Sequence, residues 1–188
     1  IINGGKHAGN SLDFQEYMLV PCAAPSFSDA LRESCDVYRA LKALLKKKFG
    51  PTSVNVGDEG GFAPPLSDAR EPLELIWRAV EETGCEKHFK LALDCAASGF
   101  YEKDAYSKGS YSVGGKKHSP GELLDFYSDL ASVYPLYSIE DGFSEDDYPA
   151  WAALNKKLGS RLKIIGDDLL CTNPALMRRA LEKGACNA

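Results

Sequence analysis

Apolar and polar residues alternate between positions 12 and 20, and this period of two predicts a β-strand. The face that carries most of the apolar side chains also carries Glu16, whereas Gln15 points to the opposite face. The members of that face are Leu12, Phe14, Glu16, Met18 and Val20. A carboxylate among apolar side chains is costly unless it is paired, protonated or placed for a task, so Glu16 is a candidate functional residue.

Two amphipathic helices are predicted after this strand. The first begins at Ser26 or Ser28 and ends at Gly50, and the second runs from about 72 to 84. The inner face predicted for the first helix consists of Leu31, Cys35, Tyr38, Leu41, Leu45 and Phe49. The inner face predicted for the second consists of Leu73, Ile76, Trp77 and Val80.

Short apolar strands alternate with helices in the second half of the chain. The strands KLALD, LYSIE and LKIIGD are separated by helices predicted after the capping box at 119–122 and over about 147–158. A further helix is predicted from Asn173 to Gly184. The stretch SKGS, at 107–110, predicts a hairpin or loop, and ACNA, at 185–188, resembles the beginning of a fourth strand.

This alternation of continuous apolar strands with helices favours a parallel sheet that is covered by helices. A complete eight-stranded β/α barrel requires about 250 residues, so a chain of 188 residues can supply half to two-thirds of one. The sequence therefore predicts a partial β/α barrel of the TIM type, with residues 1–188 as a single partial domain.

Three acidic residues share one position in this pattern, because each closes an apolar strand. They are Asp94, Glu140 and Asp167. The C-terminal ends of parallel barrel strands meet at one mouth, and carboxylates without His or Cys favour a hard divalent ion such as Mg²⁺. The alternative is that these acids are ordinary helix caps, which would explain the neighbouring Asp141 and Asp168 equally well.

A second candidate site surrounds the motif NVGDEGGFAPP, at 55–65, in which Asp58 and Glu59 lie among glycines. If Glu16 and Glu59 approach each other, each raises the proton affinity of the other, and one can act as a general acid. The alternative is a surface turn rich in Gly and Asp. His7, in the Gly-rich opening of the chain, is either part of this site or an ordinary polar loop residue.

Composition excludes several classes of function. Hydrophobic residues make up 44% of the chain and the net charge is −5, which fits a globular domain. There is no basic stripe for nucleic acid and no apolar run of about 18 residues for a membrane span. Six scattered cysteines without a C-x-x-C pair favour reduced thiols in a cytoplasmic protein over disulfides or a zinc site.

The sequence resembles enolase, the phosphopyruvate hydratase of glycolysis, essentially from end to end. The motifs that carry the resemblance are NGGKHAGN, FQEYM, NVGDEGGFAPP, LALDCAAS, YSIEDGF and IIGDDLLCTNP, in the family's order and approximate spacing. The resemblance implies a central fragment of the enolase C-terminal barrel domain that is incomplete at both ends. It also implies that a small N-terminal domain and the later part of the barrel lie outside these residues.

The resemblance further implies a role for each candidate residue. Asp94, Glu140 and Asp167 are similar to the family's Mg²⁺ ligands, and the last two also border the substrate. Glu59, with Glu16 beside it, is similar to the acid that helps hydroxide leave as water. His7 and Gln15 are similar to substrate contacts, and so is Glu16. The implied reaction interconverts 2-phosphoglycerate and phosphoenolpyruvate, in a protein that is a homodimer when full length.

Several departures keep two alternatives open. The family's base lysine is expected beyond Ala188, so residues 1–188 alone are expected to be inactive. Gly99 stands where the family usually has Glu, and Lys6 stands where Ser is common. The alternatives are another enolase-superfamily enzyme, such as an acid-sugar dehydratase, and a non-catalytic degenerate copy that acts as a binding protein.

Overall fold

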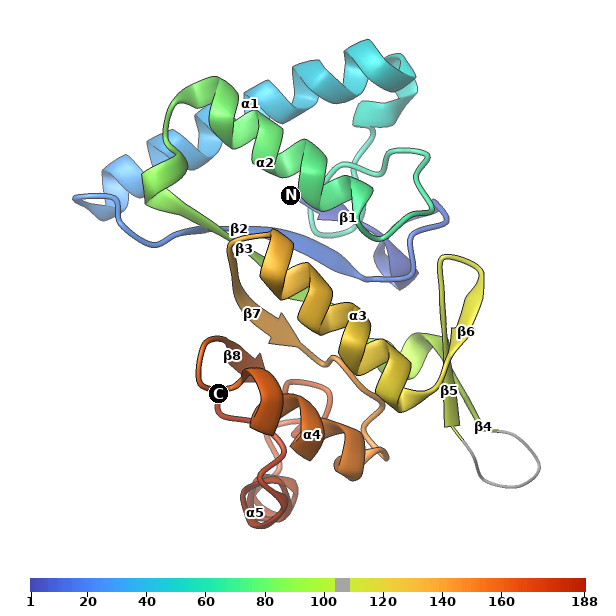
Figure 1. The fold of residues 1–188 in the computed structure, drawn as a ribbon. Coiled ribbons are helices and arrows are strands. Elements are labelled where there is room, and N and C mark those ends of the chain that lie inside the picture. The colour runs from blue at the N-terminus through green and yellow to red at the C-terminus, as the bar shows by residue number, and fades with distance from the viewer. Residues whose placement is uncertain (104–108) are drawn as a thin grey trace. The chain divides into compact units, whose positions relative to one another are not determined.

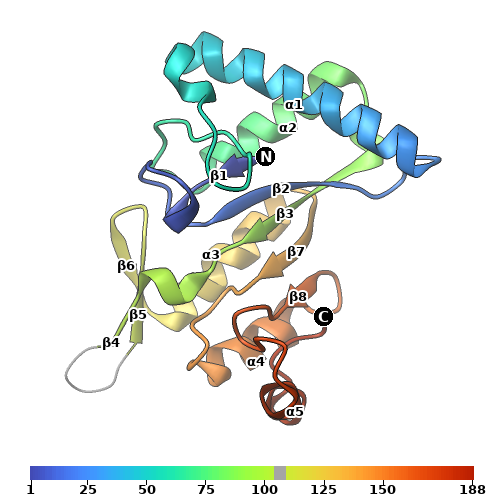
Figure 2. The same cartoon turned by 180° about the vertical axis from the view of Figure 1, so that it is seen from behind.

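The computed structural model describes residues 1–103 and 109–188, which form two compact units, Ile1–Ala92 and Leu93–Ala188. Figures 1 and 2 show the elements of both units from opposite sides. Each unit combines helices with strands, and the fold is the mixed α/β, largely parallel arrangement that the sequence predicts. The described residues do not form a closed barrel.

In the first unit, β1 (Ile2–Asn3) pairs antiparallel with β2 (Glu16–Pro21), and Asn3 lies opposite Glu16. The unit also contains the beginning of β3 (Phe89–Asp94). The predicted strand over 12–20 is wrong in its extent, because β2 begins only at Glu16. The carbonyls of Leu12 and Gln15 accept hydrogen bonds from Gly5 and Gly4, so the segment before β2 folds back onto the Gly-rich turn η1 (Gly5–His7).

Two helices pack against each other in this unit, and both Figures 1 and 2 show them side by side. They are α1 (Phe27–Phe49), whose N-cap is Ser26 as predicted, and α2 (Glu71–Thr83), which ends at Gly84 in the left-handed region. Along the chain, the short η2 (Pro51–Val54) follows α1, and η3 (Glu86–His88) connects α2 to β3.

The buried face of α2 includes Leu73, Ile76 and Val80, as predicted, but that of α1 differs from the prediction. The buried residues of α1 are Glu33, Val37, Leu41 and Leu45, spaced four apart. Leu31 and Cys35 are exposed instead. A stripe that begins with a carboxylate cannot be recognised by hydrophobicity, which explains the error.

In the second unit, β7 (Leu136–Glu140) pairs parallel with β8 (Lys163–Ile165), and Glu140 lies opposite Ile165. The end of β3 joins β7 through the Cys95 N–H, which donates to the Glu140 carbonyl. The turn η4 (Ala97–Phe100) follows. A separate antiparallel sheet contains β4 (Tyr101–Lys103), β5 (Gly109–Val113) and β6 (Lys116–His118). The predicted hairpin at 107–110 falls partly on 107 and 108, which lie outside the described residues.

Three helices complete the second unit, and each begins where the sequence predicts it. The capping box of Ser119 and Glu122 opens α3 (Pro120–Val133), Asp147 caps α4 (Tyr148–Leu158), and Asn173 caps α5 (Pro174–Lys183). The core beneath them contains the edge-to-face rings of Tyr111, Phe143 and Tyr127. No helix in the described part of the chain is both long and apolar enough to cross a membrane.

The predicted beginning of a fourth strand at 185–188 is not present, although these residues lie beside β8. The amides of Asn187 and Ala188 donate to the Ile164 carbonyl in β8, and the Asn187 side chain accepts from the Ile164 N–H. Both amides share one acceptor and the third bond involves a side chain, so the last residues are held beside β8 without regular strand pairing.

Candidate functional site

Two clusters of candidate residues are present, one in each unit. The first lies at the C-terminal ends of β3 and β7, whose last residues are Asp94 and Glu140. The carboxylate of Asp94 accepts the Ala96 N–H at 3.0 Å, which turns the chain sharply after the strand. Carboxylate oxygens of Asp94, Glu140 and Asp141 all lie within 4.8 Å of one another. Carboxylate oxygens this close together are the kind of ligand that a hard divalent cation prefers.

Asp141 has a different task from its two neighbours. Its side chain is only 4% exposed, and its backbone adopts the left-handed region with φ +43°. The carboxylate accepts backbone N–H bonds from Asp167 at 3.3 Å, Asp168 at 2.9 Å and Leu169 at 3.3 Å. Burial raises the pKa of Asp141 to about 6, although these N–H bonds act in the opposite direction. Asp141 therefore anchors the loop that follows β8.

Asp167 enters this region through its backbone. The Asp167 N–H donates to the Asp141 carboxylate. Asp167 lies two residues after Ile165, the end of β8, which pairs with Glu140. The side chain of Asp167 is exposed, and its carboxylate is not in the group formed by Asp94, Glu140 and Asp141. The structure thus brings together two of the three predicted strand-end acids, with Asp141 as the third member of the group.

The second cluster consists of His7, Glu16 and Glu59 in the first unit. Their ligating atoms also lie within 4.8 Å of one another, so the predicted approach of Glu16 and Glu59 is present. The His7 Nδ1 and a Glu16 carboxylate oxygen are 3.1 Å apart, and both side chains are about three-quarters buried, with 26% and 22% exposure. Glu59 is exposed. Gln15 lies half-buried just before β2, next to Glu16.

The glycines of the NVGDEGGFAPP motif allow a close backbone approach. The Gly61 N–H donates to the Asn3 side chain at 2.9 Å, and the Asp58 N–H donates to the His7 carbonyl at 3.1 Å. A Cβ on Gly57 would lie 2.3 Å from the His7 carbonyl oxygen, and a Cβ on Gly61 would lie 2.7 Å from Asn3. A surface turn alone does not require this, so the glycines serve to hold the motif against the His7 turn.

A hollow of about 380 Å³ adjoins this second cluster. Its lining is mostly polar and combines a cation, an imidazole and a carboxylate. The residues around it are Lys6, His7, Ala8, Gly9, Val56, Gly57, Asp58 and Ala63. A small polar molecule fits such a lining better than an apolar one does.

The family model for the enolase C-terminal TIM barrel domain matches residues 1–188, the whole chain. The chain belongs to the enolase C-terminal domain family. Proteins named enolase are 49% identical to it in Methanopyrus kandleri and 47% identical in Pyrococcus furiosus and Thermococcus kodakarensis. Each comparison spans all of this chain and 44% of the relative, so the chain covers less than half the length of these enolases.

The residue that the sequence analysis missed is Asp141, which it could assign only to a generic cap. The adjacent acids Glu140 and Asp141 give no sign that one side chain turns back under the next loop. This turn uses the left-handed backbone region, which Asp adopts more readily than most residues. Neither hydrophobicity nor periodicity marks such a position in a sequence.

Substituting Gly57→Ala tests the close approach of the glycine-rich motif. The new Cβ collides with the His7 carbonyl, so we expect a loss of about 1–3 kcal/mol in the free energy of unfolding, measured in urea. The matched control is Gly9→Ala, where a Cβ meets nothing within 4 Å and φ is not left-handed. Equal stability of the two variants would contradict the packing described above.

Substituting Asp141→Ala tests the anchoring of the loop after β8. The N–H groups of Asp167, Asp168 and the buried Leu169 lose their acceptor, at a cost of about 1–3 kcal/mol. We expect amide hydrogen exchange over 167–169 to accelerate about 5- to 150-fold, with Asp168→Asn, an exposed neighbour, as control. Unchanged exchange in the Asp141 variant would show that the loop is held by other contacts.

Proposed function

We propose that residues 1–188 form the central part of an enolase, a lyase of glycolysis that interconverts 2-phosphoglycerate and phosphoenolpyruvate plus water. The single observation that carries the proposal is the pair of strand-end carboxylates, Asp94 and Glu140, grouped within 4.8 Å in a chain of this family. The His7, Glu16 and Glu59 cluster supports it, because two carboxylates and an imidazole supply acid chemistry separate from metal binding.

The donor set fits Mg²⁺, since it contains only carboxylate oxygens. In the proposal, Asp94, Glu140 and Asp167 hold the ion, and Asp141 positions the loop from which Asp167 projects. The Asp141 oxygens already accept three backbone N–H bonds, so they are poor candidates for direct coordination. When bound, Mg²⁺ supplies Lewis-acid stabilisation of negative charge on the substrate.

The second cluster acts on the leaving group in this proposal. Glu59 gives a proton to the departing hydroxide, so that it leaves as water. Glu16 keeps its orientation through the 3.1 Å contact with His7 Nδ1. His7, which lines the polar hollow, and Glu16 beside it are substrate contacts in this proposal. Gln15 supplies a further polar contact. Removal of the substrate proton is assigned to a lysine outside residues 1–188, as the resemblance implies.

The same resemblance supports a cytoplasmic homodimer as the form of the complete protein. A small anionic substrate is compatible with the net charge of −5, because a bound divalent ion reverses the local field at a carboxylate cage. Neither nucleic acid nor a membrane is part of the proposal.

Kinetics of the complete gene product tests the proposal. We expect turnover of 2-phosphoglycerate that requires Mg²⁺, and a loss of kcat of about 10²- to 10⁴-fold in Glu59→Gln, since the general acid is removed. The matched control is Glu82→Gln, an exposed acid on α2, which should retain full activity.

The outcome also separates the alternatives. Dehydration of sugar acids without activity on 2-phosphoglycerate would replace the proposal with a different superfamily reaction. No turnover of either class by a folded, Mg²⁺-loaded protein would identify a non-catalytic copy. Full activity in Glu59→Gln would remove that residue from the mechanism.

A further inference from the structure

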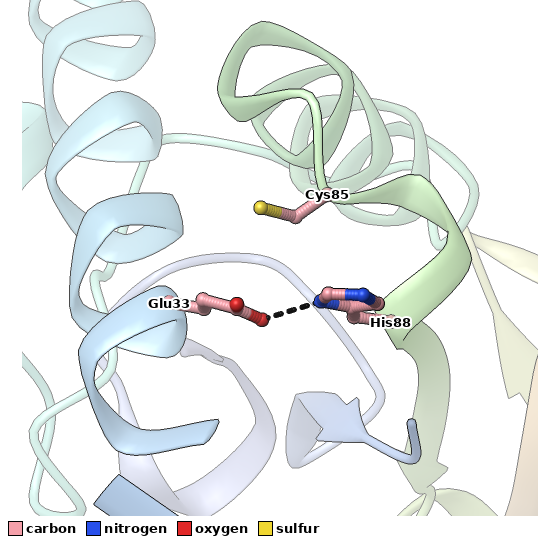
Figure 3. A group of neighbouring side chains, drawn as sticks. All are labelled: Glu33, Cys85 and His88. Atoms are coloured by element: carbon pink, nitrogen blue, oxygen red, sulfur yellow. Dashed lines mark hydrogen bonds and ion pairs between the residues drawn. The ribbon is translucent and has the colours of Figure 1, made fainter. Parts of the chain in front are cut away.

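A third group of side chains lies in the first unit and belongs to neither cluster described above. Glu33 projects from α1. Cys85 directly precedes η3, the turn between α2 and β3, and His88 is the last residue of that turn. One oxygen, one sulfur and one imidazole nitrogen from these residues lie within 4.8 Å of one another. Figure 3 shows the three side chains directed toward one another, with the Glu33 carboxylate 2.8 Å from His88 Nδ1.

The position of Glu33 requires an explanation. Its exposure is 6%, and it occupies the first place of the buried stripe that continues with Val37, Leu41 and Leu45. A carboxylate at such a position loses its hydration and needs compensating contacts. The Arg32 guanidinium is 3.5 Å from one carboxylate oxygen of Glu33, which is a long contact. The other oxygen faces His88 at 2.8 Å. The stripe therefore presents a negative charge to the turn that carries the thiol and the imidazole.

The spacing of the other two residues suits chelation. Cys85 and His88 are three positions apart on a 3₁₀ turn, where side chains at i and i+3 lie on the same side. A C-x-x-H pair combined with a carboxylate from another helix supplies the N, S and O donors that Zn²⁺ accepts. Mg²⁺ does not favour thiolate or imidazole, so this site selects a different class of ion from the carboxylate cage.

We propose that Glu33, Cys85 and His88 form a binding site for a transition-metal ion of the Zn²⁺ type. A thiolate and a carboxylate together cancel the two positive charges of the ion, and solvent can supply a fourth ligand at the side where Cys85 and His88 are partly exposed. Binding releases the Cys85 proton to solvent, and His88 Nδ1 gives up the proton that it shares with Glu33, so that the neutral imidazole carries its proton on Nε2. It also replaces the weak contact of the thiol with the Thr83 carbonyl, at 3.6 Å.

Binding requires two changes: a wider gap between Glu33 and His88, and an inward shift of the Cys85 sulfur, which lies within 4.8 Å of both. Tetrahedral Zn²⁺ ligands at 2.0–2.3 Å from the ion are about 3.3–3.8 Å apart. The Glu33 oxygen and His88 Nδ1, now 2.8 Å apart, need to separate by about half an ångström to admit the ion between them. The consequence of binding is a cross-link between α1 and the turn that leads into β3, which stabilises the first unit.

Binding of Co²⁺, a spectroscopic substitute for Zn²⁺, tests the proposal. The full gene product is reduced and kept in excess Mg²⁺, so that carboxylate cages are occupied, and is then titrated with Co²⁺ alone. We expect a thiolate-to-Co²⁺ charge-transfer band that saturates at one ion per chain and that Zn²⁺ abolishes. A raised melting temperature with Zn²⁺ should accompany it, because metal binds the folded state.

The variants make the test specific. Cys85→Ser should abolish the band, and Glu33→Gln and His88→Gln should weaken Co²⁺ binding at least about tenfold, since even a group that only orients a ligand is worth 10- to 100-fold in affinity. Cys35→Ser, an exposed thiol on the same helix as Glu33, is the matched control and should bind normally. Circular dichroism without metal establishes that each variant is folded.

Three results would overturn the proposal: no band in the unaltered protein, a band that persists in Cys85→Ser, or an equal loss in Cys35→Ser. None of these measurements depends on lyase activity. Failure of the metal site and failure of the proposed function are therefore distinguished.

Discussion

The buried carboxylate of Asp141 is the constraint on which the strand-end site depends. Three successive backbone N–H groups, at 167–169, converge on its two oxygens, and this fixes the loop after β8 to the end of β7. Burying the charge has a cost, which appears as a pKa raised to about 6. This buried carboxylate lies directly after Glu140, so the loop that carries Asp167 is held at the strand end where Glu140 and Asp94 project their carboxylates.

A comparable arrangement holds the second cluster. Asn3 binds the Gly61 amide, and neither glycine has room for a Cβ: Gly57 packs on the His7 carbonyl and Gly61 on the Asn3 side chain. The two adjacent acids of the motif are thereby held by backbone contacts instead of by side-chain packing. This explains why Glu59 can stand exposed on a nearly bare backbone and still lie within reach of Glu16 and His7.

The sequence was sufficient for elements whose signal is local. The caps at Ser26, Ser119 and Asn173 and the strand ends at Asp94 and Glu140 follow from short motifs and from strand periodicity, and the structure confirms these elements. The close approach of the Asp94 and Glu140 carboxylates could also be predicted from the sequence, because the C-terminal ends of parallel strands lie at one edge of the sheet.

Features that depend on distant partners could not be read in this way. Glu33 is buried because His88 faces it from 55 positions away, and no helical period shows that. The strand predicted from Leu12 begins only at Glu16, because the carbonyls of Leu12 and Gln15 accept hydrogen bonds from the Gly5 and Gly4 amides. The absence of C-x-x-C pairs argued against zinc, yet it says nothing about a C-x-x-H turn that meets a carboxylate on another helix.

We propose that one divalent ion is held by Asp94 and Glu140 at the ends of β3 and β7 and by Asp167 in the loop after β8, with Asp141 as the residue that positions this third ligand. An anomalous difference map from crystals of the complete protein grown with Mn²⁺ in place of Mg²⁺ tests it most directly. The account predicts one strong peak within coordination distance, about 2.0–2.3 Å, of carboxylate oxygens of Asp94, Glu140 and Asp167. A peak coordinated by Asp141 instead of Asp167, or no peak at these strand ends, would contradict it.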